Sequence, residues 1–182
     1  MYRYYTTSVV IFLVFSLICG MALAEDNSKK ISVVAVGDNL IHPVVYNDAQ
    51  QSDGTFNFRP MYSKVKKDIT TPDLSFVNQE SPLGGDYIPF SGFKQFNTPS
   101  QVANDIVATG FDVINGANSR ALDQDDRGVN QNIHTWQKFN NNILFTGIFN
   151  SKKEADRVHT ITINGIKVSV LSYTYGTNDM TS

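Results

Sequence analysis

The strongest constraint on the fold is a set of three short apolar segments, each followed at once by polar residues. The first, residues 31–36, is a nearly continuous run of Ile, Val and Ala that stops just before Asp38. Apolar runs of this length are typical of strands buried in an α/β sheet. Residues 73–77 and 111–114 repeat the pattern, and polar residues follow them too. We therefore predict an α/β fold.

Segments with a helical spacing of apolar residues separate the predicted strands. A helix beginning at Thr98-Pro99 has a capping residue and a proline in its first turn, and Gly110 is suited to end it. The dipeptide Asn164-Gly165 suits a type I′ turn. Besides the three strands, we predict helices over 60–70, 98–110 and 129–136, a strand over 143–146 and a hairpin over 158–173. Together these form a βαβαβ half followed by antiparallel strands.

The composition narrows the functional classes. The chain has 182 residues, with 15 Lys+Arg against 17 Asp+Glu and a formal net charge of −2. This balance supplies no excess of basic groups for neutralising phosphates, so we do not expect nucleic acid as a partner. The single cysteine, Cys19, excludes an internal disulfide framework, and the fold must depend on its hydrophobic core.

The N-terminal segment has the pattern of an export signal. Arg3 carries its only charge, residues 9–18 are almost wholly apolar, and an Ala-x-Ala motif ends at Ala24. The alternative is an uncleaved anchor, although the apolar stretch is short of the ~20 residues that span a bilayer comfortably. We expect a signal peptide or N-terminal membrane anchor over 1–24, and an extracytoplasmic domain, secreted or anchored to the outer face of the membrane, over 25–182.

Polar side chains beyond the first three predicted strands are candidates for one shared metal site. The carboxyl ends of parallel strands open onto the same crevice, so residues placed there converge. Asn78 and Glu80 would point to the same side of an extended segment, and Asp38 would meet His42 if the chain turned helically after Gly37. The predicted metal ligands are Asp38, His42, Glu80 and Asn118. Carboxylate, imidazole and amide together suit Mn²⁺, Fe²⁺, Zn²⁺ or Mg²⁺ and exclude a thiolate site.

The same crevice is predicted to bind a ligand through Asn78, Arg120 and Asp123. A guanidinium group at position 120 suits a carboxylate or phosphate of an anionic polymer. The alternative is that Arg120 pairs with a nearby carboxylate, from Asp123, Asp125 or Asp126. The loop of residues 81–97, rich in Gly, Pro and aromatic residues, is either a lid or binding loop or a well-packed surface loop.

Three of these elements resemble motifs of a known family, the bacterial capsule-synthesis proteins of the CapA type. The segment Val34-Ala-Val-Gly-Asp-Asn-Leu-Ile-His42 is similar to the opening strand and Gly-Asp-x-x-x-His element of that family. Asn78-Gln-Glu80 is similar to its Asn-x-Glu element. Asn115-Gly-Ala-Asn-Ser-Arg-Ala-Leu-Asp123, with Gly128, is similar to its Asn-Asn-His-x-x-Asp segment. The resemblance covers roughly residues 31–175.

The resemblance implies a metallophosphatase-like α/β/β/α sandwich, related to the calcineurin-like phosphoesterases. It also implies an extracytoplasmic, membrane-associated protein that acts in the synthesis or export of poly-gamma-glutamate or a related anionic polymer. Its expected partners are that polymer and the membrane-bound subunits of capsule synthesis and export. Because the family has a further C-terminal portion with more histidines, we expect the fold to be incomplete at its C-terminus.

Two functional hypotheses follow. The first is a capsule-synthesis component that binds an acidic polymer, with or without catalytic activity. The alternative is a metal-dependent phosphoesterase, in which a metal held by Asp38 or Glu80 activates water. Where the family has Asn and His, this chain has Ser119 and Arg120, and a protonated arginine neither ligates a metal nor accepts a proton. The substitution argues against turnover, so the sequence leaves enzymatic activity undecided.

Overall fold

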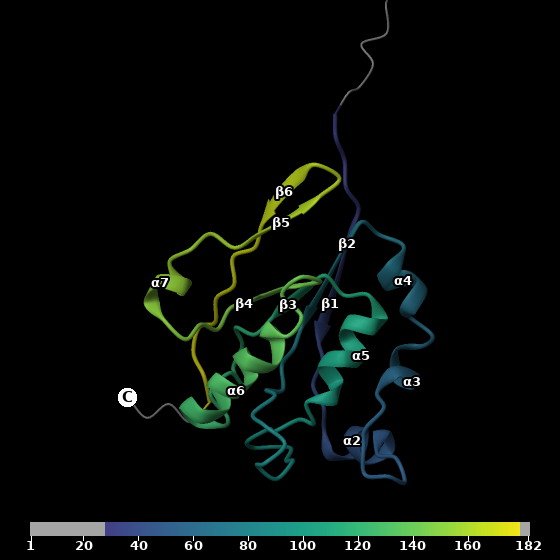
Figure 1. The fold of residues 1–182 in the computed structure, drawn as a ribbon, viewed down its shortest axis with the longest axis vertical. Coiled ribbons are helices and arrows are strands. Elements are labelled where there is room, and N and C mark those ends of the chain that lie inside the picture. The colour runs from purple at the N-terminus through teal and green to yellow at the C-terminus, as the bar shows by residue number, and fades with distance from the viewer. Residues whose placement is uncertain (1–27, 179–182) are drawn as a thin grey trace, which may run out of the picture.

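The computed structural model describes residues 28–178 and has a parallel four-stranded sheet at its centre (Figure 1). The sheet order follows the chain order: β1 (Val33–Asp38), β2 (Leu74–Asn78), β3 (Val113–Asn115) and β4 (Leu144–Thr146). All three neighbouring pairs are parallel. The predicted α/β class is confirmed, and the sheet with its helices is consistent with a metallophosphatase-like α/β fold.

Helices connect the strands, and α5 and α6 lie in front of the sheet in Figure 1. Gly110 ends α5 in the left-handed conformation, with φ 111°, as the sequence predicts. The helix predicted over 129–136 lies within α6. The helices are α2 (Pro43–Ala49), α3 (Arg59–Tyr62), α4 (Lys66–Thr70), α5 (Gln101–Thr109), α6 (Asp125–Gln137) and α7 (Lys152–Ala155).

Two predicted helix boundaries are wrong. The single helix expected over 60–70 is broken into α3 and α4, because the Ser63 hydroxyl and N–H both donate to the Pro60 carbonyl and close the first piece. The helix expected to begin at Thr98 begins at Gln101. Its cap residue, Ser100, donates from its N–H and its hydroxyl to the carboxylate of Asp86, so the preceding loop sets the start of α5.

A hydrophobic core joins one face of the sheet to the helices. Val77 of β2 and Ile114 of β3 pack in the same cluster as Ile106 of α5 and Trp136 of α6, and none of these is more than 2% exposed. The Trp136 ring stacks on Phe145 of β4, with centroids 5.5 Å apart. Full burial of side chains of this size contributes roughly 1.5–3 kcal/mol each, so this cluster is the main source of stability.

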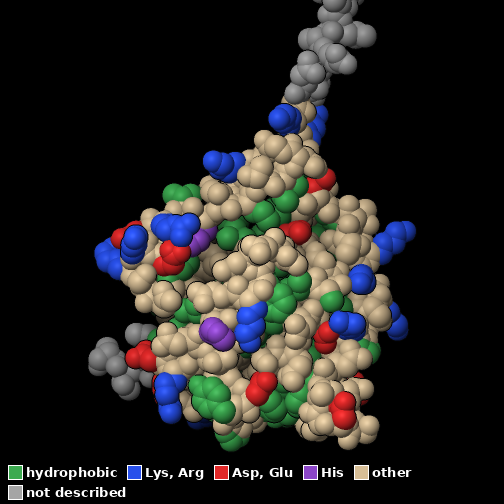
Figure 2. All heavy atoms as spheres, viewed as in Figure 1, with side chains coloured by type: hydrophobic (Ala, Val, Ile, Leu, Met, Phe, Trp, Pro, Cys, Tyr) green, Lys and Arg blue, Asp and Glu red, His purple; other side chains and the backbone are tan. Residues whose placement is uncertain are grey.

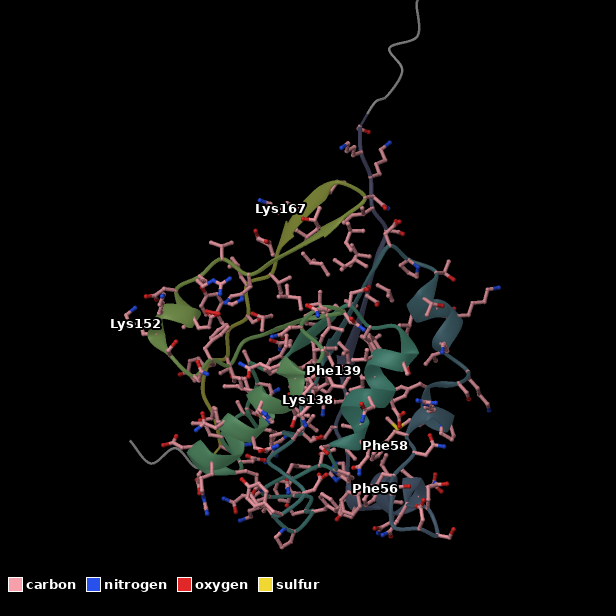
Figure 3. All side chains as sticks on the ribbon, viewed as in Figure 1. Phe56, Phe58, Lys138, Phe139, Lys152 and Lys167 are labelled. Carbon is pink, nitrogen blue, oxygen red and sulfur yellow. The ribbon has the colours of Figure 1, made fainter. Side chains whose placement is uncertain are left out.

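Aromatic side chains connect the helical layer to the loop of residues 81–97. Phe56 and Phe58, labelled in Figure 3, precede α3 and stack with their centroids 6.1 Å apart. Phe56 meets the ring of Phe90 edge-on at 5.3 Å. Phe58 itself is only 1% exposed. The loop is therefore anchored to the same packed layer that supports the sheet.

The predicted hairpin is confirmed. Strands β5 (Thr160–Ile163) and β6 (Ile166–Ser169) pair antiparallel as a separate two-stranded sheet. Asn164 and Gly165 have φ of 51° and 75°, the two positive values that a type I′ turn requires. The Asn164 side chain donates to the carboxylate of Asp73 at 2.7 Å, which ties the turn to the start of β2.

Strand β1 differs from the buried strand that the sequence predicts. Val33 is 57% and Val36 40% exposed, and Val34 is the only half-buried residue of the strand. The physical reason is its position, since β1 lies at an edge of the sheet and β2 is its only partner among the described strands. An edge strand leaves one side open to solvent, which an apolar sequence does not reveal.

Charged side chains are spread over the face of the molecule shown in Figure 2, where Lys and Arg lie mostly around the periphery and alternate with Asp and Glu. Between residues 28 and 178, no helix has the length and apolar character needed to cross a membrane. The signal peptide or anchor predicted over 1–24 lies outside the described residues.

Candidate functional site

The first three strands end side by side at the same edge of the sheet. Asp38 is the register partner of Asn78, and Asn78 is the register partner of Asn115. These residues come from segments up to 77 positions apart, yet the parallel sheet brings their side chains together. The strand ends therefore form the centre of the candidate site.

Asn78 connects the polar groups of this cluster. Its amide nitrogen donates to Asp38 Oδ1 and to Glu80 Oε2, both at 2.8 Å. Its amide oxygen accepts from Asn115 at 2.9 Å and from Asn118 at 3.4 Å. The carboxylates of Asp38 and Glu80 thus share one neutral donor. This donor positions both carboxylates but does not cancel their negative charge.

Glu80 and Ser119 extend the cluster toward solvent. The second carboxylate oxygen of Glu80 accepts from the Ser119 hydroxyl at 3.0 Å. Glu80 is half-buried, whereas Asp38 is exposed. We refer to Asp38, Asn78, Glu80 and Ser119 as the strand-end cluster.

Asn118 lies beside this cluster, but its side-chain amide is hydrogen-bonded mainly to backbone groups. It is 7% exposed, and its amide nitrogen donates to the Gln79 carbonyl at 2.9 Å. Its amide oxygen accepts from the Arg120 N–H at 2.9 Å. Asn118 therefore fixes the path of the chain after β3, and its predicted role as a metal ligand stays a prediction.

A buried hydrogen-bond chain supports the strand-end cluster from behind. The Tyr62 hydroxyl donates to Asn39 Oδ1 at 3.0 Å, and Asn39 Nδ2 donates to Gln79 Oε1 at 2.7 Å. Gln79 in turn donates to the Ser81 carbonyl at 2.6 Å. Asn39 and Gln79 each adjoin a residue of the cluster, so this chain keeps both carboxylate-bearing segments in position.

Replacing Tyr62 with phenylalanine should destabilise the protein by about 1–2 kcal/mol, because Asn39 Oδ1 would lose its buried donor. Burial also raises the pKa of Tyr62 above its usual value of 10.0. The neutral phenol therefore contributes stability that is complete below about pH 10 and is lost as the pH rises further. Chemical denaturation at pH 7 and pH 10.5 measures both effects. Tyr87→Phe, at a 64% exposed position, should change neither the free energy of unfolding nor its pH dependence. A Tyr62→Phe variant as stable as the wild type would contradict the hydrogen bond from Tyr62 to Asn39.

His42 does not join the strand-end cluster in the predicted way. The expected meeting with Asp38 required a helical turn, but residues 39–42 are not helical and His42 is the extended cap residue of α2, with ψ 162°. Its ring instead meets Phe96 edge-on, with centroids 5.0 Å apart. The proline at position 43 explains this, because it disfavours helical backbone in the residue before it.

Arg120 is engaged by the loop of residues 81–97. Its guanidinium lies over the rings of Phe93 and Phe96, at 5.4 and 5.0 Å from their centroids, and it donates to the Lys94 carbonyl. It also lies 3.6 Å from Asp123 Oδ2, in a pair whose side chains are 16% and 1% exposed. The alternative pairing with Asp123 is therefore observed.

Asp123 is similarly committed to the loop. The carboxylate accepts from the Phe96 N–H at 2.9 Å, and the residue is 5% exposed. Arg120 and Asp123 together bind the end of the loop of residues 81–97 to the segment that follows β3. Ligand binding by these two residues stays a prediction, and any ligand would compete with contacts already made within the chain.

The loop of residues 81–97 is well packed over most of its length. Leu83 and Asn97 are fully buried, and the Asn97 side chain accepts from the Gly84 N–H at 2.9 Å and donates to the Gly85 carbonyl at 3.0 Å. Tyr87 and Phe93 project outward instead, at 64% and 71% exposure. Most of the loop is therefore the well-packed surface loop of the two predicted alternatives. Only its two exposed aromatic side chains are free to contact a ligand.

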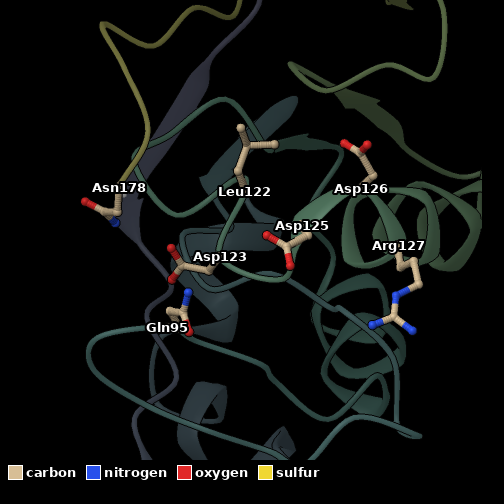
Figure 4. A pocket seen from close by; sticks show the side chains of 7 residues that line it. All are labelled: Gln95, Leu122, Asp123, Asp125, Asp126, Arg127 and Asn178. Carbon is tan, nitrogen blue, oxygen red and sulfur yellow. The ribbon is translucent and has the colours of Figure 1, made fainter. Parts of the chain in front are cut away.

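A cavity of about 390 Å³ lies next to Asp123 (Figure 4). Its lining includes three aspartates and one arginine and comes from the start of α6 and the segment before it, the end of the loop and the C-terminal segment. The residues are Gln95, Leu122, Asp123, Asp125, Asp126, Arg127 and Asn178. Of the predicted site residues, only Asp123 lines this cavity, so we do not place the candidate site there.

The family of the chain follows from a comparison with known protein families. Residues 32–182 match the family described as bacterial capsule synthesis protein PGA_cap. The chain belongs to this family. The resemblance to capsule-synthesis proteins of the CapA type is thereby confirmed, and a general role in capsule synthesis follows. No curated protein matches the chain.

Within this PGA_cap chain, the strand-end cluster has the donor chemistry of a hard cation. Asp38 and Glu80 both have an oxygen within 2.8 Å of one atom, and Ser119 adds a hydroxyl. Such oxygen donors suit Mg²⁺ or Mn²⁺ better than Zn²⁺, which favours imidazole and thiolate. Residues 28–178 hold no group of three or more His, Cys, Asp or Glu side chains placed for a metal. The strand-end cluster thus offers a cation two protein carboxylates, and metal binding there stays a prediction.

Sequence reasoning missed several residues of the site. Asn115 and Ser119 were read only as parts of a motif, and Asn39 and Gln79 were not singled out. Asn115 was detectable, because pairing the three strand ends in register places it beside Asn78. The buried chain through Asn39 had no such signal, since its partner Tyr62 comes from a distant helix.

Proposed function

We propose that this protein is an exported or membrane-anchored capsule-synthesis component that binds poly-gamma-glutamate or a related anionic polymer at the strand-end cluster. The observation that carries the proposal is the pair of carboxylates, Asp38 and Glu80, gathered on the Asn78 amide. Two carboxylates repel an acidic polymer unless a cation intervenes. A divalent cation held there would supply positive charge for the carboxylate or phosphate groups of the ligand.

The chain's own residues provide the rest of the proposed site. Asn78 holds the two carboxylates in place, and Ser119 orients Glu80 through the outer oxygen. Phe93, which contacts Arg120 next to Ser119 in the sequence, exposes 71% of its surface. An exposed, supported ring offers an apolar surface for the aliphatic part of a polymer chain.

A binding assay with the full chain and poly-gamma-glutamate tests this proposal. We expect binding in millimolar Mg²⁺ or Mn²⁺, loss of binding in EDTA, and at least tenfold weaker binding for Glu80→Ala. Glu154→Ala, which removes a half-buried carboxylate of α7 that is paired with Arg157, is the matched control and should bind normally. Binding that persists in EDTA, or that is equal in the two variants, would refute the cation-dependent site.

The alternative function, a metal-dependent phosphoesterase, is favoured by the same convergence of Asp38 and Glu80. It is disfavoured by Arg120 at the position of the family's histidine and by the placement of His42 against Phe96. The one ring contact of His42 among the described residues is with Phe96, so the structure shows no imidazole bonded to the strand-end cluster. Hydrolysis of a generic phosphate monoester in Mn²⁺, abolished by Glu80→Ala, would establish the alternative in place of the binding role.

The export part of the proposal has its own prediction. Deleting residues 1–24 should leave the protein in the cytoplasm, because the charged and apolar parts of the signal would be gone. Fractionation of cells carrying the full chain or the deletion measures this. Replacing Arg3 alone with Gln is a milder control that keeps the apolar part. A deleted protein still found outside the cytoplasmic membrane would contradict export through this segment.

A further inference from the structure

The side-chain amide of Asn78 has an orientation that its neighbours select. An amide carries a donor end and an acceptor end of nearly the same shape, so its hydrogen-bond partners decide which way it faces. The oxygen of Asn78 accepts from the Asn115 side chain at 2.9 Å and from the Asn118 side chain at 3.4 Å. The nitrogen therefore faces the carboxylates of Asp38 and Glu80.

Backbone groups fix both ends of the Asn115 amide in turn. Its oxygen accepts from the Ala117 N–H at 3.2 Å, and its nitrogen donates to the Ala117 carbonyl at 3.1 Å as well as to Asn78. A backbone N–H only donates and a carbonyl only accepts, so exchanging the two ends of Asn115 would break both bonds. Gly147 packs closely here, since a Cβ at this position would lie 2.9 Å from Asn115 Oδ1. Asn115 is thus a fixed donor aimed at Asn78.

The nitrogen of Asn78 fills the point at which the two carboxylates of the strand-end cluster converge. Asp38 Oδ1 and Glu80 Oε2 both lie 2.8 Å from it. A divalent cation binds oxygen lone pairs, whereas an amide nitrogen presents only hydrogens. If the amide turned over, its oxygen would face the carboxylates and could bind the cation with them. Its nitrogen would then face the donors of Asn115 and Asn118, so the turned orientation is unfavourable without a cation.

We propose that Asn115 is a positioning residue that acts as a latch on the proposed cation site. Its bond holds the Asn78 amide in the observed orientation, and a cation enters between Asp38 and Glu80 only when that amide turns over and releases Asn115. A ligand that binds one of two conformations has its affinity lowered by the population of the other. Asn115 thus lowers the affinity for the cation. The inference rests on the proposed function and adds a control on the occupancy of that site.

Titration of the full chain with Mn²⁺, followed by the electron paramagnetic resonance of the free ion, tests the latch. Asn115→Ala removes a hydrogen bond that only the observed orientation makes, so it should bind Mn²⁺ about threefold to tenfold tighter than the wild type. Asn132→Ala removes another buried amide, which accepts from Trp136 Nε1 at 3.0 Å, and should bind as the wild type does.

The outcomes separate the latch from the proposed function. Equal or weaker binding by Asn115→Ala than by the wild type would overturn the latch and leave the cation site standing, as would equal tightening in Asn132→Ala. No binding by the wild type or by Asn115→Ala would overturn both.

Nuclear magnetic resonance of the wild type keeps the latch testable if Asn115→Ala does not fold. Without metal, the amide hydrogens of Asn78 should give Overhauser cross-peaks to the side-chain CH₂ groups of Asp38 and Glu80. At saturating Mg²⁺, we expect cross-peaks to the amide hydrogens of Asn115 and Asn118 in their place. Cross-peaks that stay with Asp38 and Glu80 while Mg²⁺ is bound would overturn the latch.

Discussion

Replacing Arg120 with alanine is expected to lower the free energy of unfolding by about 3 kcal/mol, the largest loss we predict for a charged residue near the site. The guanidinium is 16% exposed, and it contacts Phe93, Phe96 and the buried carboxylate of Asp123. Its removal would leave the negative charge of Asp123 in a nearly closed position without its cation. Denaturant unfolding of the two proteins measures the difference.

Two controls separate this effect from a general loss of charge. Lys152→Ala removes an ion pair of similar type, but its side chains are 85% and 61% exposed, so the cost should stay below about 1 kcal/mol. Adding Asp123→Asn to Arg120→Ala should recover part of the loss, because the uncompensated charge disappears. An Arg120→Ala protein as stable as the wild type would show that Arg120 does not hold the loop.

Arg120 also bears on the enzymatic alternative. Arg120→His restores the residue type found in the family, but the ring would have to leave the space between Phe93 and Phe96 to reach the strand-end cluster. The structure therefore gives no reason to expect that this substitution alone creates phosphoesterase activity. The loop contacts of the native arginine are more consistent with a site that binds than with one that transfers protons.

Asn78→Asp should have the second largest effect on stability. We expect the variant to be less stable than the wild type in EDTA and to gain more stability than the wild type from metal. In EDTA, the variant replaces a donor shared by Asp38 and Glu80 with a third carboxylate, so we expect a loss of at least about 2 kcal/mol from unmade hydrogen bonds and added repulsion. In Mg²⁺ or Mn²⁺, the third carboxylate becomes a ligand. The metal-dependent rise in melting temperature should therefore exceed that of the wild type.

The control for this prediction is Asn78→Ala, which removes the same donor without adding a ligand. It should lose stability in EDTA but gain little from metal. Thermal melts of the three proteins with and without metal provide the comparison. If Asn78→Asp gained no more from metal than Asn78→Ala, the strand-end cluster would not be a cation site.

The strand-end cluster could be predicted because it depends on local pattern and parallel topology. Once residues 31–36 and 73–77 are read as parallel strands, Asp38 and Asn78 must come together, and the i, i+2 spacing brings Glu80 to the same side. The hairpin was predictable for a similar reason, since Asn-Gly specifies its own turn. Both inferences use only a few neighbouring residues and one rule of sheet geometry.

The rest depended on contacts between distant segments. The helical turn that would bring His42 to Asp38 is absent from residues 39–42, where His42 is extended before Pro43 and its ring packs on Phe96. The loop partners of Arg120 lie 24 to 27 positions earlier in the chain, and the path of that loop has no sequence signature. The exposure of β1 follows from its place at the edge of the sheet. In each case, tertiary structure supplied information that local propensity does not contain.

The measurement that tests the central claim most directly is the metal dependence of thermal unfolding in the full chain, with Glu80→Ala as the comparison. The account predicts that Mg²⁺ or Mn²⁺ at 100 times its dissociation constant stabilises the wild type by about 2.7 kcal/mol, and that Glu80→Ala gains no such stability. Metal content of the purified proteins should follow the same order. Equal melting temperatures with and without metal, or the same shift in Glu80→Ala, would contradict a cation site at the strand ends.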